Sequence, residues 1–417
     1  LCKFYVKLKL MEEIKLPYVC ILGGGAVRGL TYIGALEALK KLNVDIKKIA
    51  GSSVGSIFAA FYAVGYNTSE LTEIFESVNF NIFKDINISL KPQLGISKGE
   101  VFYEFVKTHV EKKFYGESYS KNNNSPVTFK DIDMDVFIFA SDLTNCEPKI
   151  FSKYTTPDFE LAKAVRISST LPGLMTPVEI DGNLLVDGDL IKSWPLWLID
   201  TNLNPENYRV LEFRLEGTSP NNNEIKGPIS FANTVMTCLS GWATKHLIDL
   251  YGNKDKFDYI VIDTKDLIIM DLNISKSQRN KLIELGQDAT LNYFKKELPI
   301  KKNKLLKMYS NILNILIKTE DKITKAKYIE AKYEMLELFY ILCDLKYIID
   351  TTVANKINDF YKLYIDSLYD IPILNIHKLR NKSIIIAKIM DIIKDLRFKE
   401  KELLQFNIAF LNFNKNL

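Results

Sequence analysis

A serine lies in a short glycine-flanked sequence that joins a predicted strand to a predicted helix. The sequence GSSVG at positions 51–55 follows the apolar run Lys48–Gly51 and precedes the apolar segment Val54–Val64. A GxSxG turn between a strand and a helix is tight and exposes its central serine, while the following helix points its N–H groups at a developing oxyanion. The sequence therefore predicts Ser53 as a nucleophile, with Gly51 and Gly55 as the small residues of the elbow.

Three consecutive glycines follow the predicted strand Tyr18–Leu22 and open the segment GGGAVRG. A dinucleotide fingerprint is excluded because Arg28 stands where its third glycine belongs, and a P-loop is excluded because no GK[ST] follows. Read alone, the segment fits either a flexible turn or a loop whose backbone N–H groups turn towards an anion. If the loop binds an oxyanion, its donors are the amides of Gly23, Gly24, Gly25 and Ala26, with Arg28 as a substrate-binding or electrostatic cation beside them.

A carboxylate is the leading candidate for the catalytic base. Asp187-Gly188-Asp189 follows the predicted strand Asn183–Val186, although an isolated Asp-Gly pair is typical of a plain turn. The chain has only three histidines, all in predicted helices: His109 and His377, expected at the surface, and His246. A serine hydrolase so short of histidine can use a carboxylate directly, so we expect Asp187 to accept the proton of Ser53.

The elements that must position these residues alternate between strands and helices. Strand, glycine loop, amphipathic helix (30–42), strand, sharp turn and helix follow one another in the first part of the chain, and such alternation is typical of an α/β domain with a parallel sheet covered by helices. Further strands are predicted at 135–142, 210–215 and 259–263, and further helices at 99–113, 159–165, 229–251 and 275–297.

Three segments together resemble the patatin-like phospholipase family: GGGAVRGLTYIGALEAL at 23–39, GSSVGS at 51–56 and VEIDGNLLVDGDL at 178–190. The family pattern is a glycine-rich loop with Arg/Lys-Gly, a GxSxG elbow shortly after it and a distant Asp-Gly-Gly/Ala. AVRISSTLPGLMTP at 164–177 resembles the stretch before the family's aspartate, and the resemblance runs from about Tyr18 to Leu198.

The resemblance implies a bacterial-type serine lipid acyl hydrolase on a three-layer α/β/α fold with a mainly parallel sheet. It implies that Ser53 and Asp187 form a catalytic dyad cleaving fatty acyl esters in the manner of a phospholipase A or lysophospholipase. The substrate is then a phospholipid or another acyl-ester lipid, and neither a metal nor another cofactor is expected.

Two positions depart from the family pattern. Ala26 stands where many relatives have another glycine, although its backbone N–H can still donate a hydrogen bond. Asp189 stands where the family usually has Gly or Ala, which adds a carboxylate next to the expected base. Proximity of the two carboxylates could raise one of their pKa values, or Asp189 could point to solvent.

The chain is expected to divide into three parts. Residues 1–16 form an N-terminal extension, with Met11 as a candidate native start, and residues 17–299 form the patatin-like catalytic domain. Residues 300–417 have one proline, no glycine and apolar residues at helical spacing, which predicts an all-helical C-terminal module of four or five helices.

Composition and charge bear on where the protein works. The chain of 417 residues has 47% hydrophobic and 25% charged residues, which excludes general disorder, and its net charge of +4 does not indicate nucleic acid. From Lys301 onwards 21 Lys/Arg face 14 Asp/Glu. This part is therefore either a helical cap that packs its apolar faces on the core or on itself, or a basic surface for transient contact with an anionic membrane. Scattered cysteines without CxxC spacing and the absence of an apolar run of spanning length predict a cytoplasmic protein, peripheral on the inner membrane face.

Two other interpretations remain open. An α/β-hydrolase triad of Ser53, Asp187 and His246 would have the right order, but the elbow of that fold comes several strands into the sheet. Alternatively, the chain is a non-catalytic lipid-binding or scaffold protein that keeps a patatin fold.

Overall fold

The computed structural model describes residues 17–85, 94–121, 123–191, 208–217, 256–264, 273–345, 351–369 and 382–414, with Gly227 and single positions between 231 and 245. The chain forms two compact units. The first comprises residues 15–248 and 257–293, and the second comprises residues 294–417 with 1–14 and 249–256. We call them the catalytic unit and the helical unit.

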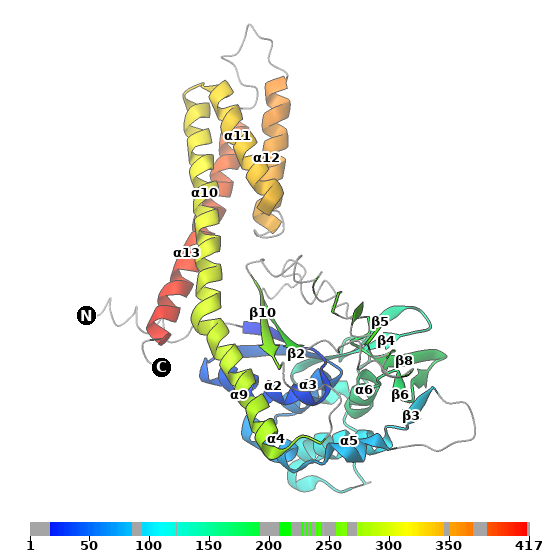
Figure 1. Ribbon diagram of the computed structural model, residues 1–417. Coiled ribbons are helices and arrows are strands. Elements are labelled where there is room, and N and C mark those ends of the chain that lie inside the picture. Colours follow the sequence, from blue (N-terminus) through cyan, green and yellow to red (C-terminus); the bar gives the residue numbers. More distant parts are fainter. Residues whose placement is uncertain are drawn as a thin grey trace. The chain divides into compact units, whose positions relative to one another are not determined.

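A mostly parallel sheet forms the middle of the catalytic unit (Figure 1). Hydrogen-bonded pairing connects its strands in the succession β10-β9-β1-β2-β4-β8-β7, and the first five are parallel to one another. The register places β2 and β8 one after the other along the same edge of β4. β8 runs antiparallel to β4, β7 runs antiparallel to β8, and β5 also pairs with β4. The bounds are β1 Pro17–Leu22, β2 Asp45–Ser52, β4 Asp135–Asp142, β5 Glu147–Phe151, β7 Val178–Ile180, β8 Asn183–Asp187, β9 Arg209–Glu216 and β10 Phe257–Asp263. A separate parallel pair consists of β3 Gly95–Ser97 and β6 Gly173–Met175.

Helices flank this sheet, as expected for the patatin-like α/β class. α3 packs on β1, β2 and β4, α6 packs on β4 and β8, and α9 packs on β10 and on α2. The helices are α2 Thr31–Lys41, α3 Val54–Ala63, α4 Thr68–Ser77, α5 Glu100–Tyr115, α6 Leu161–Ser168 and α9 Lys276–Asn292. Short 3₁₀ segments lie at Ala26–Leu30, Phe80–Lys84, Gly116–Ser118 and Phe129–Asp131, and a π-helical turn lies at Tyr293–Glu297. The helix predicted over 229–251 lies mostly outside the described residues.

His109 on α5 lies only partly at the surface, where the sequence predicted a surface position. Its ring lies 4.4 Å from the Phe105 ring and 5.8 Å from the Phe61 ring, measured between centroids. Its Nδ1 lies 2.8 Å from the Phe105 carbonyl oxygen. Burial lowers the pKa of His109, and the charge of Lys112 acts in the same direction.

A buried ion pair between Arg209 and Asp258 lies where the strands β1, β9 and β10 begin. Asp258 is completely buried and accepts a hydrogen bond from Arg209 Nη2 at 2.7 Å. The hydroxyl of Tyr18 donates to Asp258 Oδ2 at 3.0 Å, and that of Tyr293 donates to Oδ1 at 2.8 Å. A buried charge is tolerated when it is paired and hydrogen-bonded, and here all these groups converge on one carboxylate.

The helical unit confirms the predicted helical C-terminal region. It contains α10 Leu298–Thr324, α11 Tyr328–Leu345, α12 Thr351–Tyr369 and α13 Lys382–Asn414. α10 packs against α11 and α13, and α12 packs against α13 (Figure 1). Residues at helical spacing form a core of its own, among them Leu305, Tyr309, Ile312, Leu316, Met335, Leu338, Ile357, Phe360, Ile389 and Leu396. Within the residues that the structure describes, no helix is both long and apolar enough to cross a bilayer.

Candidate active site

The turn between β2 and α3 holds Ser53 in a strained backbone conformation. Its φ is 51° and its ψ is −130°, and a positive φ is uncommon for a residue other than glycine. A Cβ on Gly55 would lie 2.1 Å from the Leu22 carbonyl oxygen, and one on Gly51 would lie 2.4 Å from that of Gly55. The turn can therefore close only with glycine at these two positions, as a nucleophile elbow requires.

Ser53 and Asp187 come together because two strands share one edge of β4. Ile138 and Phe139 of β4 pair with both β2 and β5, so β2 and β5 lie on opposite edges. Residues 140–142 pair with both β5 and β8, so β8 lies on the same edge as β2. Ser52, the last residue of β2, pairs with Phe139, and Asp187, the last residue of β8, pairs with the adjacent Ala140. The two strands thus end against each other.

A buried serine at the end of α6 connects the two strand ends. The backbone N–H of Ser53 donates to Ser168 Oγ at 3.0 Å, and Ser168 Oγ donates to the Phe139 carbonyl at 2.5 Å. The N–H of Gly188 donates to the Ser168 carbonyl at 3.3 Å, and that of Asp187 donates to the Thr170 carbonyl at 2.9 Å. The segment 168–170 therefore fixes the backbone on both sides of the candidate dyad.

The glycine loop lies over the elbow, and its first amide is engaged elsewhere. Gly23 donates its N–H to the Phe213 carbonyl of β9 at 3.4 Å, and its own carbonyl accepts the Tyr32 hydroxyl at 2.7 Å. Burial raises the pKa of Tyr32, so this hydroxyl keeps its proton. The N–H of Gly23 is thus used in a hydrogen bond to β9. The remaining candidate oxyanion donors are the amides of Gly24, Gly25 and Ala26.

Asp189 turns towards this loop rather than to solvent. Its Oδ2 accepts the N–H of Gly24 at 2.9 Å. Its own N–H donates to Asp187 Oδ1 at 2.9 Å. A Cβ on Gly24 would lie 2.1 Å from Asp189 Oδ2 and 2.8 Å from the Ser53 Cβ, so the loop approaches both residues as closely as glycine permits.

Arg28 supports the loop from inside. Its side chain is buried, its Nε donates to the Gly25 carbonyl at 3.3 Å, and burial lowers its pKa. The charge of Asp189 acts in the opposite direction on the same pKa, so the two groups interact. Arg28 is therefore a buried cation beside the loop, and its Nε faces the protein backbone.

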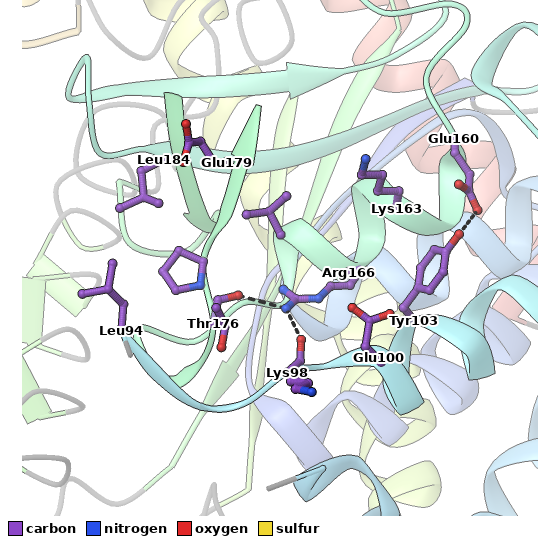
Figure 2. A pocket seen from close by; sticks show the side chains of 12 residues that line it. Leu94, Lys98, Glu100, Tyr103, Glu160, Lys163, Arg166, Thr176, Glu179 and Leu184 are labelled. Atoms are coloured by element: carbon purple, nitrogen blue, oxygen red, sulfur yellow. Dashed lines mark hydrogen bonds between the residues drawn. The ribbon is translucent and has the colours of Figure 1, made fainter. Parts of the chain in front are cut away.

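A cavity of about 730 Å³ is lined by residues of α5, α6, β7 and β8, among others (Figure 2). In Figure 2, Leu94 and Leu184 lie at one side, Lys163, Glu160 and Tyr103 lie at the other, and Arg166 lies between them. Ser53 and Asp187 are not among the lining residues, so the cavity is not the catalytic centre itself.

Arg166 connects the cavity wall to the candidate dyad. Its Nη2 donates to the Thr176 carbonyl at 2.9 Å and also to the Lys98 carbonyl. Its Nη1 donates to Thr170 Oγ1 at 2.5 Å, and the Thr170 carbonyl accepts the N–H of Asp187. Arg166 therefore contacts both the cavity and the segment that holds the backbone of Asp187.

Sequence reasoning did not assign a role to two residues of the site. Ser168 belongs to the run Ser168-Ser169-Thr170, and three consecutive hydroxyl residues after an apolar helix were the available signal. Tyr32 showed only as one position of an amphipathic helix. His246 and His377 lie outside the described residues.

Comparisons with known proteins show what this chain is similar to. Residues 20–198 match the patatin-like phospholipase family. The chain is similar to an uncharacterised protein of Acanthamoeba polyphaga mimivirus, with 32% identity over 190 residues that cover 44% of this chain and 61% of the relative. It is 25% identical over 297 residues to an uncharacterised protein of Bacillus subtilis, covering 66% of this chain and 97% of the relative.

A third relative is described as a probable lipid hydrolase, from Invertebrate iridescent virus 6. The identity is 27% over 181 residues, which cover 42% of this chain and 61% of the relative. The chain therefore spans less than two thirds of the length of the first and third of these relatives.

Proposed function

Because residues 20–198 carry a patatin-like phospholipase domain, we propose that this protein is a serine lipid acyl hydrolase with Ser53 as nucleophile and Asp187 as base. The observation that carries the proposal is the shared edge of β4, where the strand ends that carry the two residues meet. The strained φ of Ser53 supports it further, because such strain is typical of a nucleophile elbow.

In the proposed reaction, Asp187 accepts the hydroxyl proton of Ser53 while Ser53 Oγ attacks the ester carbonyl. The amides of Gly24, Gly25 and Ala26 stabilise the negative oxygen of the tetrahedral intermediate. The intermediate collapses, and the leaving alcohol takes the proton from Asp187. Water then attacks the acyl-enzyme, gives its proton to the same carboxylate and releases the fatty acid as Ser53 regains a proton.

A fluorophosphonate probe and a fatty acyl ester assay test the proposal directly. Ser53→Ala should abolish both labelling and ester hydrolysis, whereas Ser52→Ala should still be labelled. Asp187→Asn should lose about as much activity as Ser53→Ala, because members of one catalytic unit are not additive. Labelling of the Ser53→Ala protein would reject the nucleophile.

The same measurements separate the two alternatives. If the wild-type protein neither reacts with the probe nor hydrolyses esters, the non-catalytic lipid-binding protein replaces the enzyme. If His246→Gln loses as much activity as Asp187→Asn while remaining folded, a triad replaces the dyad.

The substrate class that we propose is a phospholipid or lysophospholipid. The match of residues 20–198 to the patatin-like phospholipase family supports this choice. The relative described as a probable lipid hydrolase supports the same class.

We further propose that the protein works in the cytoplasm and meets its substrate at an anionic membrane surface. One exposed side of α13 supports this proposal, because helical spacing brings together three exposed cations with exposed apolar residues: Met390, Lys394, Arg397, Lys401 and Leu404. A basic and apolar helix face is typical of proteins that lie on a lipid surface.

Vesicle co-sedimentation tests this contact. Each Lys or Arg near an anionic leaflet contributes roughly 1 kcal/mol. The triple variant Lys394→Glu/Arg397→Glu/Lys401→Glu should therefore bind phosphatidylserine-containing vesicles at least about 100-fold more weakly, and binding of the wild type should weaken with salt. Equal binding of both proteins would move the membrane contact to another surface.

A further inference from the structure

The carboxylate of Asp189 lies where the proposed reaction needs empty space. Its Oδ2 accepts the Gly24 N–H at 2.9 Å, and the Cβ position of Gly24 is close to both this oxygen and the Ser53 Cβ. An acyl carbonyl ready for attack must place its oxygen about 3 Å from the oxyanion donors, with its carbon next to the nucleophile. The carboxylate oxygen therefore stands in for the substrate oxygen at Gly24.

The neighbourhood holds this carboxylate in place. The N–H of Asp189 donates to Asp187 Oδ1, so the backbone of the residue is tied to the candidate base. The cation of Arg28 interacts with the Asp189 charge. A hydrogen bond from an N–H group to a carboxylate is stronger than one to a neutral carbonyl, so an ester competes at a disadvantage for the same amide.

We propose that Asp189 is an internal competitor of the substrate: its carboxylate occupies the Gly24 amide in the free protein and must leave before the ester carbonyl can bind there. This inference rests on the proposed function. It makes Asp189 a positioning residue, because it acts on the reaction by closing or opening the Gly24 amide. It also gives a reason for the acidic residue at a position where the family usually has Gly or Ala.

The rate of inactivation by a fluorophosphonate measures how open the amide is, because the phosphoryl oxygen of the probe needs the same donors. Asp189→Gly and Asp189→Ala should react about 10-fold to 100-fold faster than the wild type, since a hydrogen bond to a charged group no longer has to be broken. The inactivation rate of Asp189→Asn should lie between those of the wild type and Asp189→Gly, because its neutral amide oxygen accepts a weaker hydrogen bond from Gly24 than a carboxylate does. Asp158→Asn, which removes an exposed carboxylate, should react like the wild type.

A second measurement distinguishes a competitor from a structural brace. Octanoate has the carboxylate of the expected product, so it should protect Ser53 from the probe at about 10-fold lower concentration in Asp189→Gly than in the wild type. If Asp189 only stabilises the local structure, Asp189→Gly should be labelled more slowly than the wild type and should not bind octanoate more tightly.

The outcomes separate this inference from the proposed function. If the wild type reacts at Ser53 but none of the Asp189 variants reacts faster, the competitor is rejected and the hydrolase stands. If neither the wild type nor any variant reacts, the proposed function falls and the inference falls with it.

Discussion

Removal of the Asp258 carboxylate should destabilise the catalytic unit more than the loss of any exposed ion pair. Asp258 is completely buried and Arg209 is only 8% exposed, so Asp258→Asn removes a carboxylate that pairs with a buried guanidinium. Breaking a buried pair in this way costs about 3–5 kcal/mol. In the wild type, the hydroxyls of Tyr18 and Tyr293 share the Asp258 carboxylate with Arg209. In the variant, a single amide oxygen remains as the acceptor for these donors.

Such a loss is a large fraction of the stability of a domain, which is typically about 5–15 kcal/mol. The exposed pair of Lys130 and Asp158 gives a matched control, because their side chains are 58% and 79% exposed. Asp158→Asn should change the stability by less than about 1 kcal/mol.

Urea unfolding followed by tryptophan fluorescence is the appropriate assay. All three tryptophans (Trp194, Trp197 and Trp242) belong to the catalytic unit, so the signal does not report on the helical unit. The free energy of unfolding then follows by linear extrapolation.

A double variant tests the cause of the loss. Arg209→Met should cost much less in the Asp258→Asn background than in the wild type, since the uncompensated charge is then gone. The reasoning is refuted if Asp258→Asn is as mild as Asp158→Asn, or if the effects of the two substitutions simply add.

Three further predictions concern the elbow, its support and pH. Gly55→Ala should lower Tm and abolish probe labelling, because a Cβ would lie 2.1 Å from the Leu22 carbonyl oxygen; a labelled, stable variant would contradict this. Ser168→Ala should slow labelling, with the loss of the Ser53 N–H acceptor costing about 1–3 kcal/mol, whereas Ser168→Thr should retain more activity. Since burial lowers the pKa of His109, the unfolded chain binds a proton first as pH falls below about 6.5. Stability should therefore fall from pH 7 to pH 5, and less so in His109→Phe, as measured by Tm across this range.

The strand and helix pattern around the candidate nucleophile could be predicted because each element carries its own signal. β1 is a short apolar run ended by glycines, and α3 follows the GxSxG sequence directly. The α10 helix could be predicted from apolar residues at helical spacing such as Leu305, Tyr309 and Ile312, all of which are buried. Local sequence determines these elements, so periodicity alone was sufficient.

Contacts between distant segments could not be predicted in the same way. No local pattern indicates that Asp189 binds the Gly24 amide, because the two residues meet only after β1, β2, β4 and β8 are assembled. The engagement of the Gly23 N–H by Phe213 depends likewise on β9, which is remote in the sequence. The position of His109 between aromatic rings depends on how α5 packs on α3, which composition does not determine.

The backbone conformation of Ser53 implies that the protein gives up stability to keep its nucleophile. A residue with a side chain is strained at a φ of 51°, whereas glycine adopts this conformation freely. Ser53→Gly should therefore be inactive and yet more stable than Ser53→Ala. Relief of the backbone strain should raise its free energy of unfolding by about 1–3 kcal/mol, and the greater chain entropy of glycine in the unfolded state should offset part of this gain. Selection for resistance to heat alone would thus favour the loss of the serine, whereas selection for activity would retain it. The same inactive variant would suit crystallisation with an intact ester, because it lacks the attacking group and is held in a relaxed elbow.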